Sequence, residues 1–233
     1  MTKPIKILLG APISESKAYI IDEWLDYVRS LTWQALDVYL VDNSPTDTFA
    51  NYVRSKGFEV DRVEPKGTRE AFVAKCQNKI RDRFLEGDYD YLFSLECDNF
   101  CVPNVIEMLL IHRLDNINVP YFLKGSNETT IGVQVQKFTT GNYTRYDVMS
   151  PIESTVFMDG KIKANHFIPS IGCSLFSRRL MEQVKFRVVT DQAGKHSDSF
   201  FHHDSLKIGI QPYVDTSLFS THKRNTAWSG VNA

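Results

Sequence analysis

Two acidic residues, Glu96 and Asp98, stand two positions apart at the end of an apolar run. That run, YLFSL over residues 91–95, is typical of a buried strand. A carboxylate buried at the end of such a strand without a partner would cost free energy. Carboxylate oxygens are hard ligands that suit Mg²⁺ or Mn²⁺ held jointly with a phosphate, and a cation would offset the repulsion between two acids. The alternative is a pair of exposed loop acids that cap the next helix, and the triplet taken alone favours that simpler interpretation.

A second polar cluster, VDNSPTD over residues 41–47, follows another apolar run in the same way. Asp42 has the chemistry to accept a hydrogen bond from a nucleobase N–H group, and Asn43 stands beside it. A turn in which Asp or Ser caps the following helix explains the same residues equally well.

The elements that must position these clusters alternate between strand and helix in the first half of the chain. The apolar patterns predict strands at 6–10, 36–43, 58–64 and 91–95, and helices at 14–31, 46–57 and 69–88. This alternation predicts a mostly parallel sheet flanked by helices, which binds ligands outside the carboxyl ends of its strands. The polar residues that follow the strands are therefore the candidates: Pro12, Ser14, Glu15, Asp42, Asn43, Ser44, Glu96, Asp98 and Asn99.

The second half of the chain has a different pattern. Residues 117–165 are rich in β-formers and turn residues, and Asp159-Gly160 predicts a hairpin. Helices are expected at 177–186 and 198–209, before a late strand that ends at His222. We therefore expect one α/β domain over residues 1–233, in which the second half adds a small antiparallel lobe.

Composition narrows the classes of function. The 233 residues, 42% of them apolar, are enough for one large core. With 27 Lys and Arg against 28 Asp and Glu, nucleic acid is not the favoured partner. No apolar stretch approaches the roughly 20 residues of a membrane span, and the four cysteines lack metal-binding spacing. We expect a reduced cytoplasmic protein, with attachment to the periphery of a membrane as the alternative location.

Taken together, these motifs resemble the nucleotide-sugar glycosyltransferases of the GT-A fold, and most closely those of family 2. VDNSPTD resembles the strand-end aspartate motif of that family, and YDYLFSLECDN resembles the strand that ends in its D-x-D metal motif. KGTREAFVAKCQNKI is similar to the helix between them, and SDSFFHHDSLKIGIQPYVDTSLFSTH resembles the closing segment, with an acid, an aromatic helix, a glycine and a final histidine. The resemblance covers nearly the whole chain in the same order.

The resemblance implies a Rossmann-like GT-A domain with a nucleotide-binding half at 1–100 and an acceptor-binding half at 101–233. It implies metal-dependent, inverting transfer of a sugar from a nucleotide diphosphate sugar, most commonly a UDP-sugar. The acceptor would be a glycan or another hydroxyl compound, and the cofactor Mn²⁺ or Mg²⁺.

The resemblance also implies roles for individual residues. Asp98 and His222, together with Glu96, correspond to metal ligands, and Asp198 corresponds to the catalytic base, with Asp204 as the second choice. The implied nucleotide-binding residues are Pro12, Glu15, Asp42, Asn43, Arg69, Asn78 and Glu96. Two positions depart from the family pattern, because Glu96 stands where Asp is usual and the acidic pair is reduced to Ser197-Asp198. A helix N-cap is the competing role for Asp198.

Two other functions are compatible with parts of this pattern. A nucleotidyltransferase would share the sheet and the carboxylates, but it normally has a Gly-rich loop after the first strand, where this chain reads LLGAPISES. A non-catalytic carbohydrate-binding relative of the fold would account for Glu96 and for the reduced acidic pair.

Overall fold

The protein is described by a computed structural model that covers residues 4–124, 129–140, 143–148, 150–164, 167–188 and 197–223. Within these residues the chain forms a mixed α/β fold around one eight-stranded, mainly parallel sheet, with smaller antiparallel sheets beside it. The fold class expected from the sequence is therefore confirmed. None of the helices in the described ranges is both long enough and apolar enough to span a bilayer.

The first half of the chain supplies four parallel strands. They are β1 (Ile7–Ile13), β2 (Leu36–Asp42), β3 (Glu59–Arg62) and β4 (Tyr91–Leu95). Helices α1 (Ile21–Ser30), α2 (Thr48–Ser55) and α3 (Arg69–Glu86) connect them. The chain moves outward from β1 to β2 and β3 and then returns to place β4 on the other side of β1. The strand order therefore reverses between β1 and β4, where open α/β sheets bind their ligands.

Apolar residues on the two sides of these strands form two separate cores. Trp24 of α1 packs in one core with Leu9, and Ile80 of α3 packs in the other with Leu8. Successive strand residues point to opposite faces, so α1 and α3 cover opposite sides of the sheet. Gly10 allows α3 to lie close to β1, because a Cβ there would come within 2.2 Å of the Ile80 side chain.

The second half of the chain extends the sheet and adds the smaller ones. Strands β6 (Asn116–Asn118), β11 (Ile162–Ala164), β13 (Cys173–Ser177) and β14 (Tyr213–Asp215) join the main sheet. The smaller sheets contain β5 (Asn99–Phe100), β7 (Phe122–Lys124), β8 (Thr129–Ile131), β9 (Val133–Thr140), β10 (Tyr143–Val148), β12 (Phe167–Pro169) and β15 (Thr221–His222). The helices are α4 (Val105–Leu110), α5 (Pro151–Phe157), α6 (Arg178–Gln183) and α7 (Ser197–Lys207).

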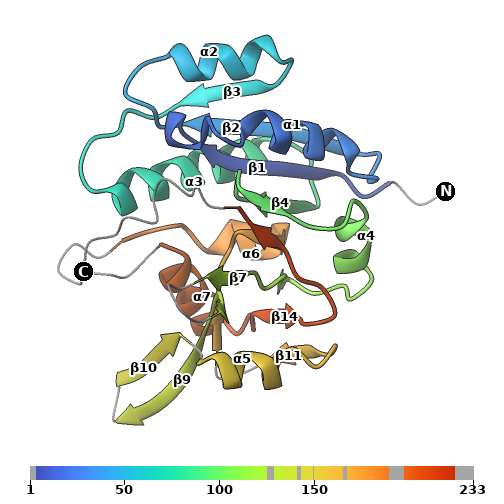
Figure 1. Cartoon of the computed structure of the whole chain (residues 1–233), viewed down its shortest axis with the longest axis vertical. Coiled ribbons are helices and arrows are strands. Elements are labelled where there is room, and N and C mark those ends of the chain that lie inside the picture. Colours follow the sequence, from blue (N-terminus) through green and yellow to red (C-terminus); the bar gives the residue numbers. More distant parts are fainter. Residues whose placement is uncertain are drawn as a thin grey trace.

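The strands of both halves share one sheet, in the order β11-β14-β6-β13-β4-β1-β2-β3. Strand β13 joins the two halves, because it runs antiparallel to both β4 and β6. Figure 1 shows α2 and β3 at one end of the molecule and the paired strands β9 and β10 at the other. The carboxyl end of β4 consequently lies between the parallel first half and the mixed second half.

The hairpin predicted at Asp159-Gly160 is wrong. The turn is present, and Gly160 has a φ of 79°, but it joins helix α5 to strand β11. The helix forms because Ser150 and Glu153 make a capping box, in which each side chain accepts from the backbone N–H of the other. The hairpin prediction did not include this local signal.

The single helix predicted over 14–31 is divided in two. Ser14 does act as a cap, but it caps a one-turn 3-10 helix, η1 (Glu15–Lys17), and α1 begins only at Ile21. The division matters for the site described below, because η1 follows β1 directly and turns the side chain of Lys17 toward β4.

Candidate active site

The three side chains proposed as metal ligands converge where β4 ends. Glu96 and Asp98 follow β4, and His222 comes from β15, which pairs with β5 so that His222 lies opposite Asn99. One potential ligand atom from each of the three residues lies within 4.8 Å of the other two. The imidazole Nε2 of His222 is 3.1 Å from the Asp98 Oδ2. Two carboxylates and an imidazole form a donor set that fits Mn²⁺ or Mg²⁺.

Burial and neighbouring charges give the two carboxylates different protonation. Burial, together with the charge of Asp98, raises the pKa of Glu96 to about 7. Burial also acts to raise the pKa of Asp98, but the hydrogen bond from His222 and the charge of Lys17 outweigh it and lower that pKa below its usual value. The site thus contains one firmly ionised carboxylate and one that exchanges its proton near neutral pH.

Lys17 is a cation at this site that the sequence analysis did not select. Its Nζ contacts the Asp98 Oδ2, the same oxygen that lies beside His222. The Lys17 side chain is 26% exposed, and the carboxylate of Asp98 is almost completely buried. The signal that could have identified Lys17 is its position just after β1, at the end of the sheet where β4 also terminates.

Gly172 and Tyr121 form walls of the same site. The Gly172 carbonyl accepts a hydrogen bond from the Glu96 N–H at 2.9 Å, and a Cβ on Gly172 would lie 2.5 Å from the Asn99 Nδ2. The Asn99 amide in turn donates to the Glu96 Oε2 at 3.2 Å. The Tyr121 ring stacks on the His222 imidazole, with centroids 5.0 Å apart. Neither Gly172 nor Tyr121 was selected from the sequence, since both come from the irregular second half.

Asp198 lies in the first turn of α7, within electrostatic range of this cluster. Burial is the main cause of the raised pKa values of Glu96 and Tyr121, and the charge of Asp198 raises both further. The Asp198 Oδ1 also accepts from the Ser199 N–H at 2.7 Å. Because α7 begins at Ser197, Asp198 is its second residue and does not occupy the N-cap position. The contacts are compatible with a base beside the site.

Asp204 is engaged in ion pairs further along α7. Arg187 holds its carboxylate with two hydrogen bonds, 2.6 Å from Nε and 3.0 Å from Nη2, and Lys207 adds a third at 2.9 Å. The hydrogen bond from Arg187 is the main cause of the lowered pKa of Asp204. A carboxylate bound to two cations is a weak proton acceptor, so this environment does not favour a catalytic base.

Asp42 is fully buried at the end of β2, in a network of polar contacts. Its Oδ1 accepts from the N–H and the hydroxyl of Ser44, at 3.1 and 2.5 Å, and its Oδ2 is 3.3 Å from the Arg62 Nε. The Glu15 N–H donates to the same Ser44 hydroxyl at 2.8 Å. Through Ser44, the network joins the ends of β1 and β2. Arg62 was not among the residues predicted from the sequence.

Pro12 and Asn43 lie at the same end of the sheet. Pro12 is opposite Val41 in the β1–β2 register, and the Asn43 N–H donates to the Ile13 carbonyl at 3.0 Å. The Asn43 side chain contacts the Cys76 sulfur at 3.7 Å, which ties the end of β2 to α3. The structure therefore brings Pro12, Glu15, Asp42 and Asn43 together.

The two remaining nucleotide-binding candidates lie on α3. Arg69 is exposed and is the first residue of the helix, which Thr68 caps. Asn78 makes two hydrogen bonds with the backbone of Phe186, donating to its carbonyl at 2.7 Å and accepting from its N–H at 3.0 Å. These contacts attach α3 to the segment that follows α6.

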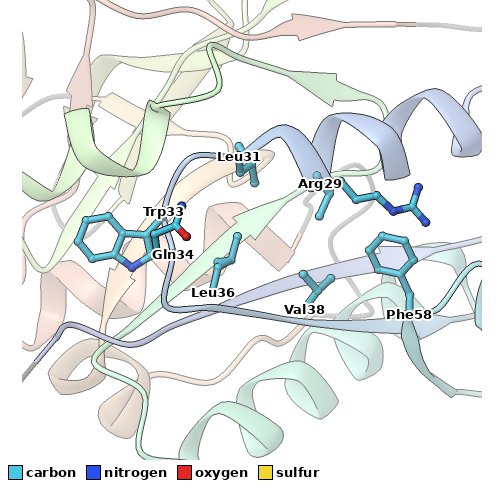
Figure 2. A pocket seen from close by; sticks show the side chains of 8 residues that line it. Arg29, Leu31, Trp33, Gln34, Leu36, Val38 and Phe58 are labelled. Carbon is cyan, nitrogen blue, oxygen red and sulfur yellow. The ribbon is translucent and has the colours of Figure 1, made fainter.

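A separate pocket of about 330 Å³ lies at the opposite end of β2, between the end of α1 and the start of that strand (Figure 2). Leu36 begins β2 and Asp42 ends it, so at about 3.3 Å per residue the pocket lies roughly 20 Å from the polar strand ends. Its lining consists of six apolar residues and two polar ones: Val28, Leu31, Trp33, Leu36, Val38 and Phe58, with Arg29 and Gln34. The pocket is thus distinct from the cluster around Asp98.

Comparisons with known proteins identify the fold. No family model matches the chain, and no curated protein is significantly similar to it in sequence. S. aureus TarS in complex with UDP-GlcNAc matches with a TM-score of 0.56 and 12% identity, over 98% of this chain and 62% of that chain. The mannosyltransferase PcManGT from Pyrobaculum calidifontis, in complex with GDP-Man and Mn²⁺, matches with a TM-score of 0.62 and 14% identity, over 97% and 59%.

The fold of this chain is that of the GT-A glycosyltransferases, as the sequence resemblance implied. A second TarS structure, in complex with UDP, matches over 93% of this chain at a TM-score of 0.57 and 12% identity. The chain spans about 60% of the length of these chains, of which the two TarS chains are the fragment 1–349. At such low identity the likeness concerns the fold, and the activity has to be argued from the site.

Proposed function

We propose that this protein is a glycosyltransferase that moves a sugar from a nucleotide diphosphate sugar to a hydroxyl acceptor with the help of a divalent cation. The observation that carries the proposal is the convergence of Glu96, Asp98 and His222 at the carboxyl end of β4. This cluster lies next to the reversal of strand order between β1 and β4. The GT-A fold, found in proteins whose structures contain UDP, UDP-GlcNAc or GDP-Man, supports it.

Asp98, His222 and Glu96 would hold the cation. When bound, Mn²⁺ or Mg²⁺ would stabilise the charge that develops on the diphosphate as the anomeric C–O bond breaks. Asp98 is suited to this role because its lowered pKa keeps it ionised. Glu96, with a pKa of about 7, would lose its proton when it becomes a ligand.

The end of β2 is the proposed site for the nucleoside. Asp42 would accept a hydrogen bond from the base, beside Pro12, Glu15 and Asn43, and Arg69 at the start of α3 would contact the nucleotide from the other side. We propose a UDP-sugar as the donor. The two hydrogen bonds of Asn78 to the backbone favour a structural role for that residue.

Asp198 is the proposed base, which would take the proton of the attacking hydroxyl. Its electrostatic proximity to Glu96 supports this role, and the ion pairs of Asp204 argue for Asp198 over Asp204. With one base and no covalent intermediate, the transfer would invert the anomeric centre. Residues 1–100 would then form the nucleotide-binding half and residues 101–233 the acceptor-binding half, where a glycan or another hydroxyl compound would bind.

Calorimetry tests the proposal, with UDP titrated into the protein in Mn²⁺ or in EDTA. We expect binding that requires Mn²⁺ and that Asp98→Asn abolishes. Asp26→Asn is the matched control, because Asp26 forms an exposed pair with Arg29 on α1. UDP binding that is unaffected by EDTA and by Asp98→Asn would overturn the proposal. Product analysis separates it from a nucleotidyltransferase, since a glycosyltransferase releases a nucleoside diphosphate and a nucleotidyltransferase releases pyrophosphate.

A further inference from the structure

Two groups converge on one oxygen of the best candidate metal ligand. The Asp98 Oδ2 contacts both the Lys17 ammonium and the His222 Nε2. A carboxylate oxygen has two lone pairs, so these two partners use the full capacity of this atom. A cation that binds to Asp98 Oδ2 must therefore displace one of them, and His222 is itself a candidate ligand of that cation.

Lys17 is the partner that electrostatics would drive away. An ammonium and a divalent cation on the same carboxylate oxygen would be only a few ångströms apart, and their charges would repel each other strongly in a partly buried site. Imidazole ligates metals in its neutral form, so His222 can exchange its hydrogen bond to Asp98 for a bond to the cation. The arrival of the cation thus drives Lys17 away from Asp98, whereas His222 stays at the site as a ligand.

The backbone near Lys17 is anchored, so only the side chain needs to move. The Ser14 hydroxyl accepts from the Ser16 N–H, and the Glu15 N–H donates to the Ser44 hydroxyl, which fixes η1 to the end of β2. The lysine side chain has a flexible four-carbon stem and three donors on its nitrogen. It is also partly exposed, at 26%, so it has a route out of the buried position.

We infer that Lys17 exchanges partners: it neutralises Asp98 when the metal is absent, and it binds the diphosphate of the donor when the cation takes its place on Asp98. This inference rests on the proposed function. The place that Lys17 would move to is the region outside the carboxyl ends of β1 and β4, where sheets of this kind bind their ligands. Lys223 is a less suitable candidate for binding the diphosphate, because its ammonium pairs with Glu23, outside the cluster of Glu96, Asp98 and His222.

Two binding measurements on Lys17→Met test the exchange, since methionine keeps the length of the side chain and removes its charge. Mn²⁺ binding without nucleotide, followed by the EPR signal of free Mn²⁺, should become about tenfold tighter, because no ammonium competes for Asp98. UDP binding in saturating Mn²⁺, measured by calorimetry, should become about tenfold weaker, because a charge-assisted contact to phosphate is lost. Lys17→Arg should restore most of the UDP affinity.

Lys56→Met is the matched control, because Lys56 also pairs with an aspartate, Asp22, and its loss changes the net charge equally. Both affinities should stay at the wild-type value in that variant. If Mn²⁺ binds the wild type but not Asp98→Asn, while Lys17→Met changes neither affinity, the inference is overturned and the proposed function stands. If Asp98→Asn binds Mn²⁺ as well as the wild type, both are overturned. A circular-dichroism melt of each variant verifies that it is folded, and Lys17→Gln, which also removes the charge, supplies the same test if Lys17→Met is not.

Discussion

Gly172 and Glu96 are in such close contact that a side chain on the glycine would force the Glu96 carboxylate to shift. A Cβ on Gly172 would lie 2.9 Å from the Glu96 Oε2, and the Gly172 carbonyl accepts from the Glu96 N–H. The segment between β12 and β13 thus holds Glu96, the first acid after β4, in place. A methyl group at this position would push the Glu96 carboxylate, and with it one of the three proposed metal ligands, out of position.

The substitution Gly172→Ala should therefore weaken Mn²⁺ binding by about tenfold or more, and reduce the free energy of unfolding by roughly 1–3 kcal/mol through overpacking. The measurements are an EPR titration with Mn²⁺ and urea unfolding of the same preparation. A loss of stability with unchanged Mn²⁺ affinity would mean that Glu96 is not a ligand.

Asp198→Asn should reduce the rate of sugar transfer by roughly 10²–10⁴-fold, the usual contribution of a general base, and should leave UDP affinity unchanged. The variant keeps an oxygen that can accept from the Ser199 N–H, so α7 should still form. Steady-state kinetics with the donor and calorimetry with UDP separate the two effects.

Asp204→Asn is the comparison variant on the same helix. It should keep most of the transfer activity and lose at most about 1 kcal/mol of stability, because its pairs with Arg187 and Lys207 are only partly buried. If Asp204→Asn were inactive and Asp198→Asn active, the role of base would belong to Asp204.

Asp42→Asn should weaken UDP binding by about tenfold without changing Mn²⁺ affinity, because Asp42 lies at the end of β2 and the cation cluster follows β4. It should also lower stability by roughly 1–3 kcal/mol, since it leaves Arg62 with a neutral partner. Asp61→Asn on β3 is the control, because Asp61 pairs with Lys79 and Tyr39 and should not affect UDP binding. Equal UDP affinities for the two variants would argue against a nucleoside site at the end of β2.

Protonation of His202 should make the protein less stable in acid. His202 is fully buried, its Nδ1 lies 3.1 Å from the Asn116 amide, and burial lowers its pKa to about 3. In the unfolded chain the pKa is about 6.5, so its contribution to stability is complete above pH 6.5 and is lost progressively as pH falls toward 3. Between pH 6.5 and pH 5 the loss should be roughly 2 kcal/mol.

The measurement for His202 is the difference between the wild type and His202→Gln in urea unfolding at several pH values. The difference is needed because the raised pKa of Glu96 gives the opposite slope between about pH 4.5 and 7. A difference that does not change with pH would show that His202 has an ordinary pKa in the folded protein.

The sequence by itself was sufficient for the features that depend on local patterns. The alternation of apolar strands and amphipathic helices predicted β1 to β4 and the helices that connect them, because hydrophobic periodicity is a property of neighbouring residues. The position of Glu96 and Asp98 after an apolar strand made them candidate cation ligands, but taken alone it favoured exposed loop acids, and the family resemblance was needed to predict a metal site. The prediction was wrong at Asp159-Gly160, where a turn signal does not specify which elements it joins.

Only the tertiary structure decided which of these side chains meet. The family resemblance implied that His222 and Asp98 belong together, but the 3.1 Å contact depends on the pairing of β15 with β5. Lys17 reaches Asp98 because β1 and β4 are neighbours in the sheet and η1 follows β1. The position of a lysine after β1 indicates that contact only once the pairing of β1 with β4 is known. Long-range strand pairing sets the charge balance and the solvent exclusion of the site, and no local stretch of sequence contains that information.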